Sequence, residues 1–85
     1  MEYKIFIEKN AQKALTKITE KEQNRIIEAI RNLSQNPKPM GVKKLSGREA
    51  WRIRVGSYRI IYEIQDDKLL IVVISIGHRR EIYRQ

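Results

Sequence analysis

Apolar and polar residues alternate along residues 51–64, WRIRVGSYRIIYEI, and this pattern predicts two β-strands joined by a short turn. With Gly56 and Ser57 as the two turn residues, Arg54 pairs with Arg59 across the ladder. Side chains alternate between the faces of a strand, so this hairpin has one apolar face and one cationic face. The apolar face carries Trp51, Ile53, Val55, Tyr58, Ile60, Tyr62 and Ile64. The cationic face carries Arg52, Arg54, Arg59, Ile61 and Glu63.

Two helices are predicted before this hairpin. Asn10 is a suitable N-cap for the first, whose apolar stripe is formed by Ala11, Ala14, Leu15 and Ile18. Thr19 and Glu22 have the spacing of a capping box and start a second, longer helix, which ends before Pro37. Its apolar face is formed by Ile26, Ile27, Ile30 and Leu33. We expect the two helices to form a hairpin that covers the apolar face of the sheet.

Two further strands complete the predicted sheet. Residues 2–8 alternate and form the first strand. Residues 69–76 are apolar on both faces, as expected of a central strand, and this strand is predicted to end at Gly77. Residues 37–48 contain prolines and glycines and are predicted to be a connector. The predicted fold class is α+β in the order β-α-α-β-β-β, with a helical hairpin packed on a mainly antiparallel four-stranded sheet.

Length and composition restrict the function more than the fold. The 85 residues form a single domain, 1–85, and the net charge of +8 favours a polyanionic partner. With no cysteine and one histidine, neither a disulfide framework nor a metal site is expected, and no cofactor is predicted. The chain has no signal-peptide pattern and no apolar run that could span a bilayer. We therefore expect a cytoplasmic protein that has no membrane partner.

Residues 43–59 concentrate the positive charge, with six basic residues against Glu49 alone. Arginines opposite each other in a ladder destabilise it, so the Arg54–Arg59 pair favours an anion bound between them. The alternative is a solvated strand face whose charge is partly balanced by Glu63, diagonal to Arg52. The hairpin pattern is consistent with both interpretations, the bound anion and the solvated strand face.

Several motifs together resemble one known family. They are KKLSG at 43–47, the hairpin at 51–64, ISIGHRREIY at 74–83 and the preceding helical pair. This combination is similar to the RelE/ParE superfamily of toxins from type II toxin–antitoxin systems. The resemblance implies a RelE-like toxin, an endoribonuclease that enters the ribosomal A site and cuts messenger RNA there. It also implies a cognate antitoxin, RelB-like or other, that silences the toxin.

The resemblance also implies site residues. Arg54 matches a basic position on the first strand of the hairpin, Arg59 matches the hairpin arginine, and Arg79 matches the arginine after the final strand. These three are assigned to the scissile phosphate, and Tyr83 matches a C-terminal tyrosine that positions the RNA. Arg52 matches an RNA-binding position. The best-known RelE pattern has lysines where this chain has Arg52 and Arg54, which leaves proton transfer unassigned because arginine is a poor general base.

Two groups of side chains could assist the arginines. The ordinary pKa of histidine, about 6.5, suits proton transfer near neutral pH, so His78 is a candidate acid or base; its alternative is a structural role at a strand end. Lys43, Lys44 and Arg48 are predicted to attract RNA without a defined contact.

Two other functions are compatible with the resemblance or the charge. The ParE branch of the superfamily shares the fold but inhibits DNA gyrase and has no nuclease site. A non-catalytic nucleic-acid-binding module would use the basic face without breaking a bond. The combination of Arg59, Arg79 and Tyr83 favours the nuclease, since a gyrase inhibitor needs no phosphate-binding site that ends in tyrosine.

Overall fold

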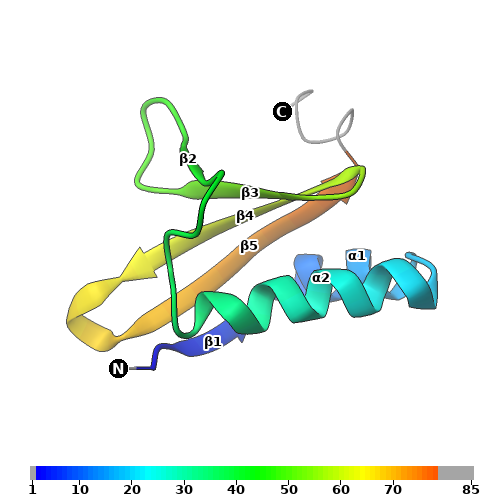
Figure 1. Ribbon diagram of the computed structural model, residues 1–85, viewed down its shortest axis with the longest axis horizontal. Coiled ribbons are helices and arrows are strands. Elements are labelled where there is room, and N and C mark those ends of the chain that lie inside the picture. The colour runs from blue at the N-terminus through cyan, green and yellow to red at the C-terminus, as the bar shows by residue number, and fades with distance from the viewer. Residues whose placement is uncertain (1, 79–85) are drawn as a thin grey trace.

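The computed structural model describes residues 2–78 and has an α+β fold, as predicted. Figure 1 shows both helices on one side of the sheet. The elements in chain order are β1 (Lys4–Ile7), α1 (Lys9–Thr16), α2 (Glu20–Leu33), β2 (Lys43–Lys44), β3 (Trp51–Val55), β4 (Tyr58–Gln65), a 3₁₀ turn (Asp66–Lys68) and β5 (Leu70–His78).

The sheet has the strand order β1-β5-β4-β3-β2 within the described residues. It has five strands instead of the predicted four, because two residues of the expected connector pair with β3 and form β2. The β1–β5 pairing is parallel and the other three pairings are antiparallel, so the prediction of a mainly antiparallel sheet is confirmed. The prediction that the last strand is central is also confirmed, since β5 lies between β1 and β4.

The β3–β4 hairpin has the predicted register. Arg54 pairs with Arg59, Arg52 with Ile61, and the turn lies at Gly56 and Ser57. Gly56 has a φ of 60°, in the left-handed region that glycine adopts without the steric cost of a Cβ atom. The local turn therefore sets which residues of the hairpin share a face.

A β-bulge interrupts the β4–β5 ladder. Ile61 pairs with Ser75 and Tyr62 with Val73, so the register passes over Ile74. An extra residue in one strand reverses the alternation of side chains beyond it. The strand also continues through Gly77 to His78, so the prediction that Gly77 ends it was wrong.

Asn10 stabilises this bulge instead of capping the first helix. Its side-chain amide donates a hydrogen bond of 2.9 Å to the carbonyl of Ile74, the residue that the β4 register passes over. Helix α1 begins at Lys9 with Glu8 at the N-cap, so the prediction that Asn10 is the N-cap was wrong. The bulge residue has no partner in β4, so the Asn10 amide supplies a hydrogen-bond partner for its carbonyl.

The start of α2 was predicted correctly in position but not in its hydrogen bonds. Thr19 is the N-cap, yet its side chain makes no capping hydrogen bond. Glu22 instead forms an ion pair with Arg25, one turn further along the helix, with 3.4 Å between the Glu22 Oε1 and the Arg25 Nη1. Glu20 and Glu22 place negative charge in the first turn, where it interacts favourably with the helix dipole.

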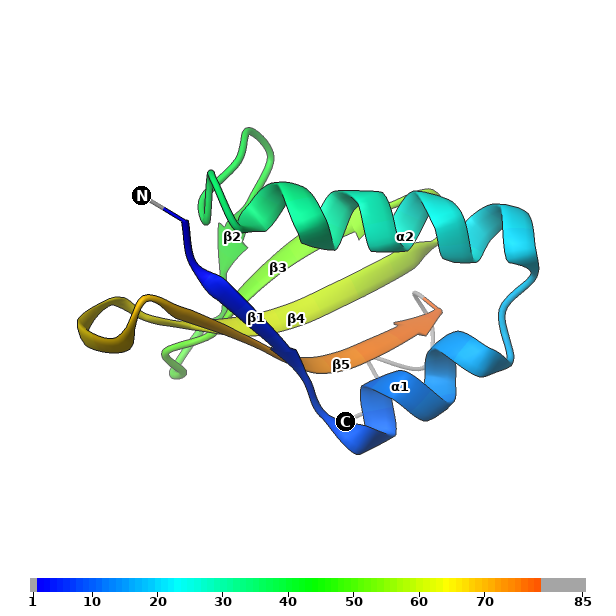
Figure 2. The same cartoon turned by 90° about the horizontal axis from the view of Figure 1, so that it is seen from below.

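The core lies between the helices and one face of the sheet. Figure 2 shows α2 lying along β3 and β4, with α1 beside β5. The core contains Ala11, Ile18, Ile26, Ile30, Leu33, Ile53, Ile60, Tyr62, Ile71, Val73 and Ile76. The predicted helix stripes are confirmed except at Ile27, which is 36% exposed, and Ile18 packs into the core from beyond the end of α1. The helices therefore cover the apolar face of the hairpin and lie on the opposite side of the sheet from its cationic face.

Tyr62 is a titratable group within this core, and we predict that it makes stability fall at alkaline pH. It is fully buried, its hydroxyl donates a 2.6 Å hydrogen bond to the Pro37 carbonyl, and burial raises its pKa from 10.0 to about 12. Folding therefore favours the neutral phenol. The resulting stabilisation is complete below pH 10 and is lost as the pH rises toward 12, by up to about 1.4 kcal/mol per pH unit.

Urea unfolding at pH 8 and pH 11 tests this prediction, with Tyr62→Phe as the matched variant. At pH 8 the wild type is expected to be about 1 kcal/mol more stable than the variant, because the variant lacks the hydrogen bond. At pH 11 the difference should shrink or reverse, since only the wild type has a phenol to ionise at this position. A difference that stays the same at both pH values would contradict the prediction.

Candidate phosphate-binding site

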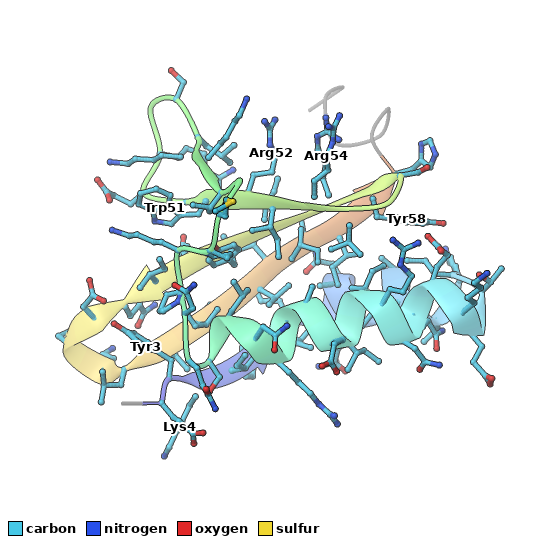
Figure 3. The ribbon with its side chains drawn as sticks, viewed as in Figure 1. Tyr3, Lys4, Trp51, Arg52, Arg54 and Tyr58 are labelled. Atoms are coloured by element: carbon cyan, nitrogen blue, oxygen red, sulfur yellow. The ribbon has the colours of Figure 1, made fainter. Side chains whose placement is uncertain are left out.

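Four cationic side chains come together on the face of the sheet opposite the helices. Figure 3 shows Arg52 and Arg54 pointing from β3 away from the helices. Arg59 shares their face because it pairs directly with Arg54. Lys43 shares it because β2 brings it opposite Arg52. Three adjacent strands therefore supply the cations, which gives them fixed backbone positions.

These cations line one pocket of about 220 Å³, together with the backbone of the loop before β2. The lining residues are Gly41, Lys43, Arg52, Arg54 and Arg59. All the ionisable groups among them are positive. We call this the cationic pocket. Guanidinium groups stay charged at any physiological pH and match the geometry of phosphate oxygens, so its chemistry suits a phosphate.

Arg59 is the least accessible of these cations, with 4% of its surface exposed. It lies in the interior strand β4, between Arg54 on β3 and Gly77 on β5. Gly77 has no side chain, so β5 places no side chain directly opposite Arg59. Two arginines held opposite each other lower the stability of the fold. A role in binding an anion between them explains why the sequence keeps this pair.

Lys44 and Arg48 lie away from the cationic pocket. Lys44 pairs with Trp51 and so points to the other face, where its Nζ lies 3.4 Å from a Glu49 carboxylate oxygen and 5.9 Å from the Trp51 ring centre. Arg48 lies with Lys44 in a separate surface pocket. Trp51 packs against the core, as predicted. The structure therefore brings only Lys43, of the three predicted auxiliary cations, to the arginines.

Comparison with known proteins identifies the family of this chain. Residues 5–83 match the model of the ParE toxin of the parDE type II toxin–antitoxin system. The chain belongs to this toxin family. The resemblance to the RelE/ParE superfamily that the sequence motifs predicted is thereby confirmed.

The relatives of this toxin include RelE-type proteins. The toxin RelG of Mycobacterium tuberculosis is 29% identical, and the alignment covers 100% of both chains. A chain of the archaeal RelE–RelB complex from Pyrococcus horikoshii is 29% identical with a TM-score of 0.84, covering 93% of this toxin and 97% of that chain. A chain of the RelB–RelE complex from Methanococcus jannaschii is 28% identical with a TM-score of 0.74, and the match covers 92% of this toxin and 94% of that chain. The protein is thus a RelE-like toxin of a type II system.

His78 of the toxin lies on the opposite face of the sheet from the arginines. It pairs with Tyr58 in the neighbouring strand. The two rings meet edge to face, with 5.7 Å between their centres and 84° between their planes. Both residues line a cleft of about 470 Å³ beside α1, along with Lys13 and Lys17. The bulge at Ile74 determines this placement, because strict alternation from Val73 would put His78 on the arginine face. The structure therefore does not bring His78 together with Arg54 and Arg59.

Arg79 and Tyr83, two other predicted site residues of the toxin, lie outside the described residues 2–78. Gly41 was not predicted as a site residue, although it lines the cationic pocket. Its contribution depends on the pairing of β2, which is too short to give an alternating signal in the sequence.

Within residues 2–78, no three or more His, Cys, Asp or Glu side chains are grouped in a way that could hold a metal ion. No helix in that part of the chain is long and apolar enough to cross a membrane.

Proposed function

We propose that this toxin is a ribosome-dependent, metal-free endoribonuclease that cuts messenger RNA in the ribosomal A site and so inhibits translation in the cytoplasm. The observation that carries the proposal is the cationic pocket, in which Lys43, Arg52, Arg54 and Arg59 converge on the face of the sheet opposite the helices. The RelE-type relatives support the same activity. An RNA phosphodiester is an anion whose charge this pocket complements.

The proposed reaction is an attack by a 2′-hydroxyl on the adjacent phosphorus. It yields a 2′,3′-cyclic phosphate and a free 5′-hydroxyl, and its transition state carries extra negative charge on the phosphoryl oxygens. Arg54 and Arg59 are proposed to stabilise that charge, since fixed cations at a developing oxyanion lower the barrier. Arg52 holds the neighbouring backbone. Arg79 and Tyr83 keep the roles inferred from the sequence, in phosphate binding and RNA positioning.

We further propose that the toxin is held inactive by a RelB-like antitoxin. The matched chains from Pyrococcus horikoshii and Methanococcus jannaschii come from complexes between RelE and RelB. A net charge of +8 on this small toxin favours a partner segment that carries acidic residues.

Primer extension on a defined message in a purified translation system tests the nuclease proposal. Wild-type toxin is expected to produce cuts at A-site codons, and no cuts when ribosomes are omitted. Arg79→Ala should abolish the cuts, because the sequence places this arginine at the scissile phosphate. Lys44→Ala is the matched control and should cut normally, since Lys44 points to the other face.

An uncut message with wild-type toxin would contradict the nuclease proposal. A gyrase supercoiling assay then tests the ParE-like alternative, which the family match to ParE toxins supports. If gyrase is also unaffected, RNA retention without cleavage would identify a non-catalytic binding module.

A further inference from the structure

We propose that Lys43 is the general acid of the cleavage reaction, donating its ammonium proton to the departing 5′ oxygen. This inference rests on the proposed nuclease function and adds a role that phosphate binding alone does not require. It starts from the composition of the cationic pocket, whose lining combines three arginines with one lysine. The structure supplies a lysine to the same pocket from a neighbouring strand.

The pairing of β2 with β3 determines where Lys43 points. Lys43 lies directly opposite Arg52, and directly paired residues project from the same face of an antiparallel sheet. That face is the one on which Arg54 and Arg59 lie, and all four side chains line the cationic pocket. The lysine therefore lines the same pocket that the arginines offer to a phosphate.

The loop around β2 is held in place by backbone hydrogen bonds. The Val42 amide donates to the Pro39 carbonyl at 3.1 Å, and the Leu45 amide donates to the Ala50 carbonyl at 2.9 Å. These bonds lie on either side of the two-residue strand and support its pairing with β3. Fixing the backbone on both sides of Lys43 reduces the conformational entropy lost when its side chain engages the phosphate.

Among the described residues of the cationic pocket, Lys43 is best suited to give a proton. The other ionisable groups there are arginines, whose pKa above about 12 makes them weaker acids than an ammonium group. His78 and Lys44 both project from the helix-facing side of the sheet. Among residues 2–78, no carboxylate lines the pocket.

The step balances with the groups present. The 2′ oxygen forms a bond to phosphorus and releases its proton to solvent water, while the bond between phosphorus and the 5′ oxygen breaks. The leaving oxygen takes a proton from the Lys43 Nζ, which becomes a neutral amine and is reprotonated from water. An alkoxide is a much stronger base than an amine, so this transfer is favourable.

A message with a sulfur atom in place of the 5′ bridging oxygen at the A-site codon tests this role. A thiolate leaves without protonation, so the modified substrate does not need a general acid. On the normal message, Lys43→Met is expected to slow single-turnover cleavage by about 100-fold or more, within the usual range for general acid–base catalysis. On the sulfur-substituted message, the variant should recover most of the wild-type rate.

Two matched variants separate proton donation from charge and from folding. Lys43→Arg keeps the positive charge and should still cleave the normal message slowly, with recovery on the sulfur-substituted one. Lys44→Met changes the neighbouring lysine on the other face and should match the wild type on both messages. Arg54→Ala should cleave both messages slowly, because both reactions develop negative charge on the phosphoryl oxygens and this variant lacks the arginine that stabilises it.

Three outcomes would overturn the inference while leaving the nuclease function intact. They are normal cleavage by Lys43→Met, wild-type rates for Lys43→Arg on the normal message, and an equal loss on both messages for Lys43→Met. If wild-type toxin cuts neither message, the proposed function itself fails and the inference fails with it.

Discussion

Arg54→Ala is expected to lower the single-turnover rate of message cleavage by about 100- to 1,000-fold, the usual loss when one fixed group that stabilises a developing oxyanion is removed. Arg54 is exposed, lies on the face opposite the helices and lines the cationic pocket, so its truncation leaves the core unchanged. The substitution also removes the like-charge pair with Arg59. The free energy of unfolding should therefore stay the same or rise by up to about 1 kcal/mol.

Cleavage in a purified translation system and urea unfolding of the same sample measure the two effects together. Lys44→Ala is the matched control, since it removes a positive charge from the adjacent strand on the other face. It should leave the cleavage rate unchanged. A loss of activity in Arg54→Ala that accompanies a clear loss of stability would contradict a role at the phosphate, because the defect would then be one of folding.

Ile26→Ala is expected to destabilise the protein by about 2–5 kcal/mol, through lost burial and the cavity left behind. Ile26 lies on α2 and is fully buried in the core. A domain of this kind has a total stability of about 5–15 kcal/mol, so this single change removes a large part of it. Urea unfolding at neutral pH measures the loss.

Ile27 provides a control from the same helix. It is 36% exposed, and Ile27→Ala is expected to cost about 1 kcal/mol or less. The two substitutions remove the same number of atoms from adjacent positions of equal helical propensity. Equal losses would mean that helix propensity, and not burial against the sheet, decides the stability of α2.

The physical difference between local and long-range interactions explains which predictions succeeded. The β3–β4 hairpin needs two turn residues and a strict alternation, and both are written in fourteen consecutive residues. Its register, with Arg54 opposite Arg59, was therefore predicted correctly. The apolar stripes of α1 and α2 are equally local, and they pack as predicted except at Ile27, which is 36% exposed.

The cationic pocket was predicted only in part. The arginines follow from the hairpin alternation, whereas Lys43 joins them through a strand of two residues. A strand that short has no periodicity of its own. It forms because the chain returns beside β3, and Lys43 and Lys44 then point to opposite faces.

The sequence by itself thus determined the two helices, the hairpin register and the face on which Arg52, Arg54 and Arg59 lie, because each depends on neighbours in the chain. Only the tertiary structure decided the pairing of β2 and the side of the sheet on which His78 lies. The bulge at Ile74 reverses the alternation of β5, and its carbonyl is bonded by the Asn10 side chain from a distant part of the chain. One extra residue in a ladder moves every later side chain to the other face, and contacts distant in sequence decide where that residue is accommodated.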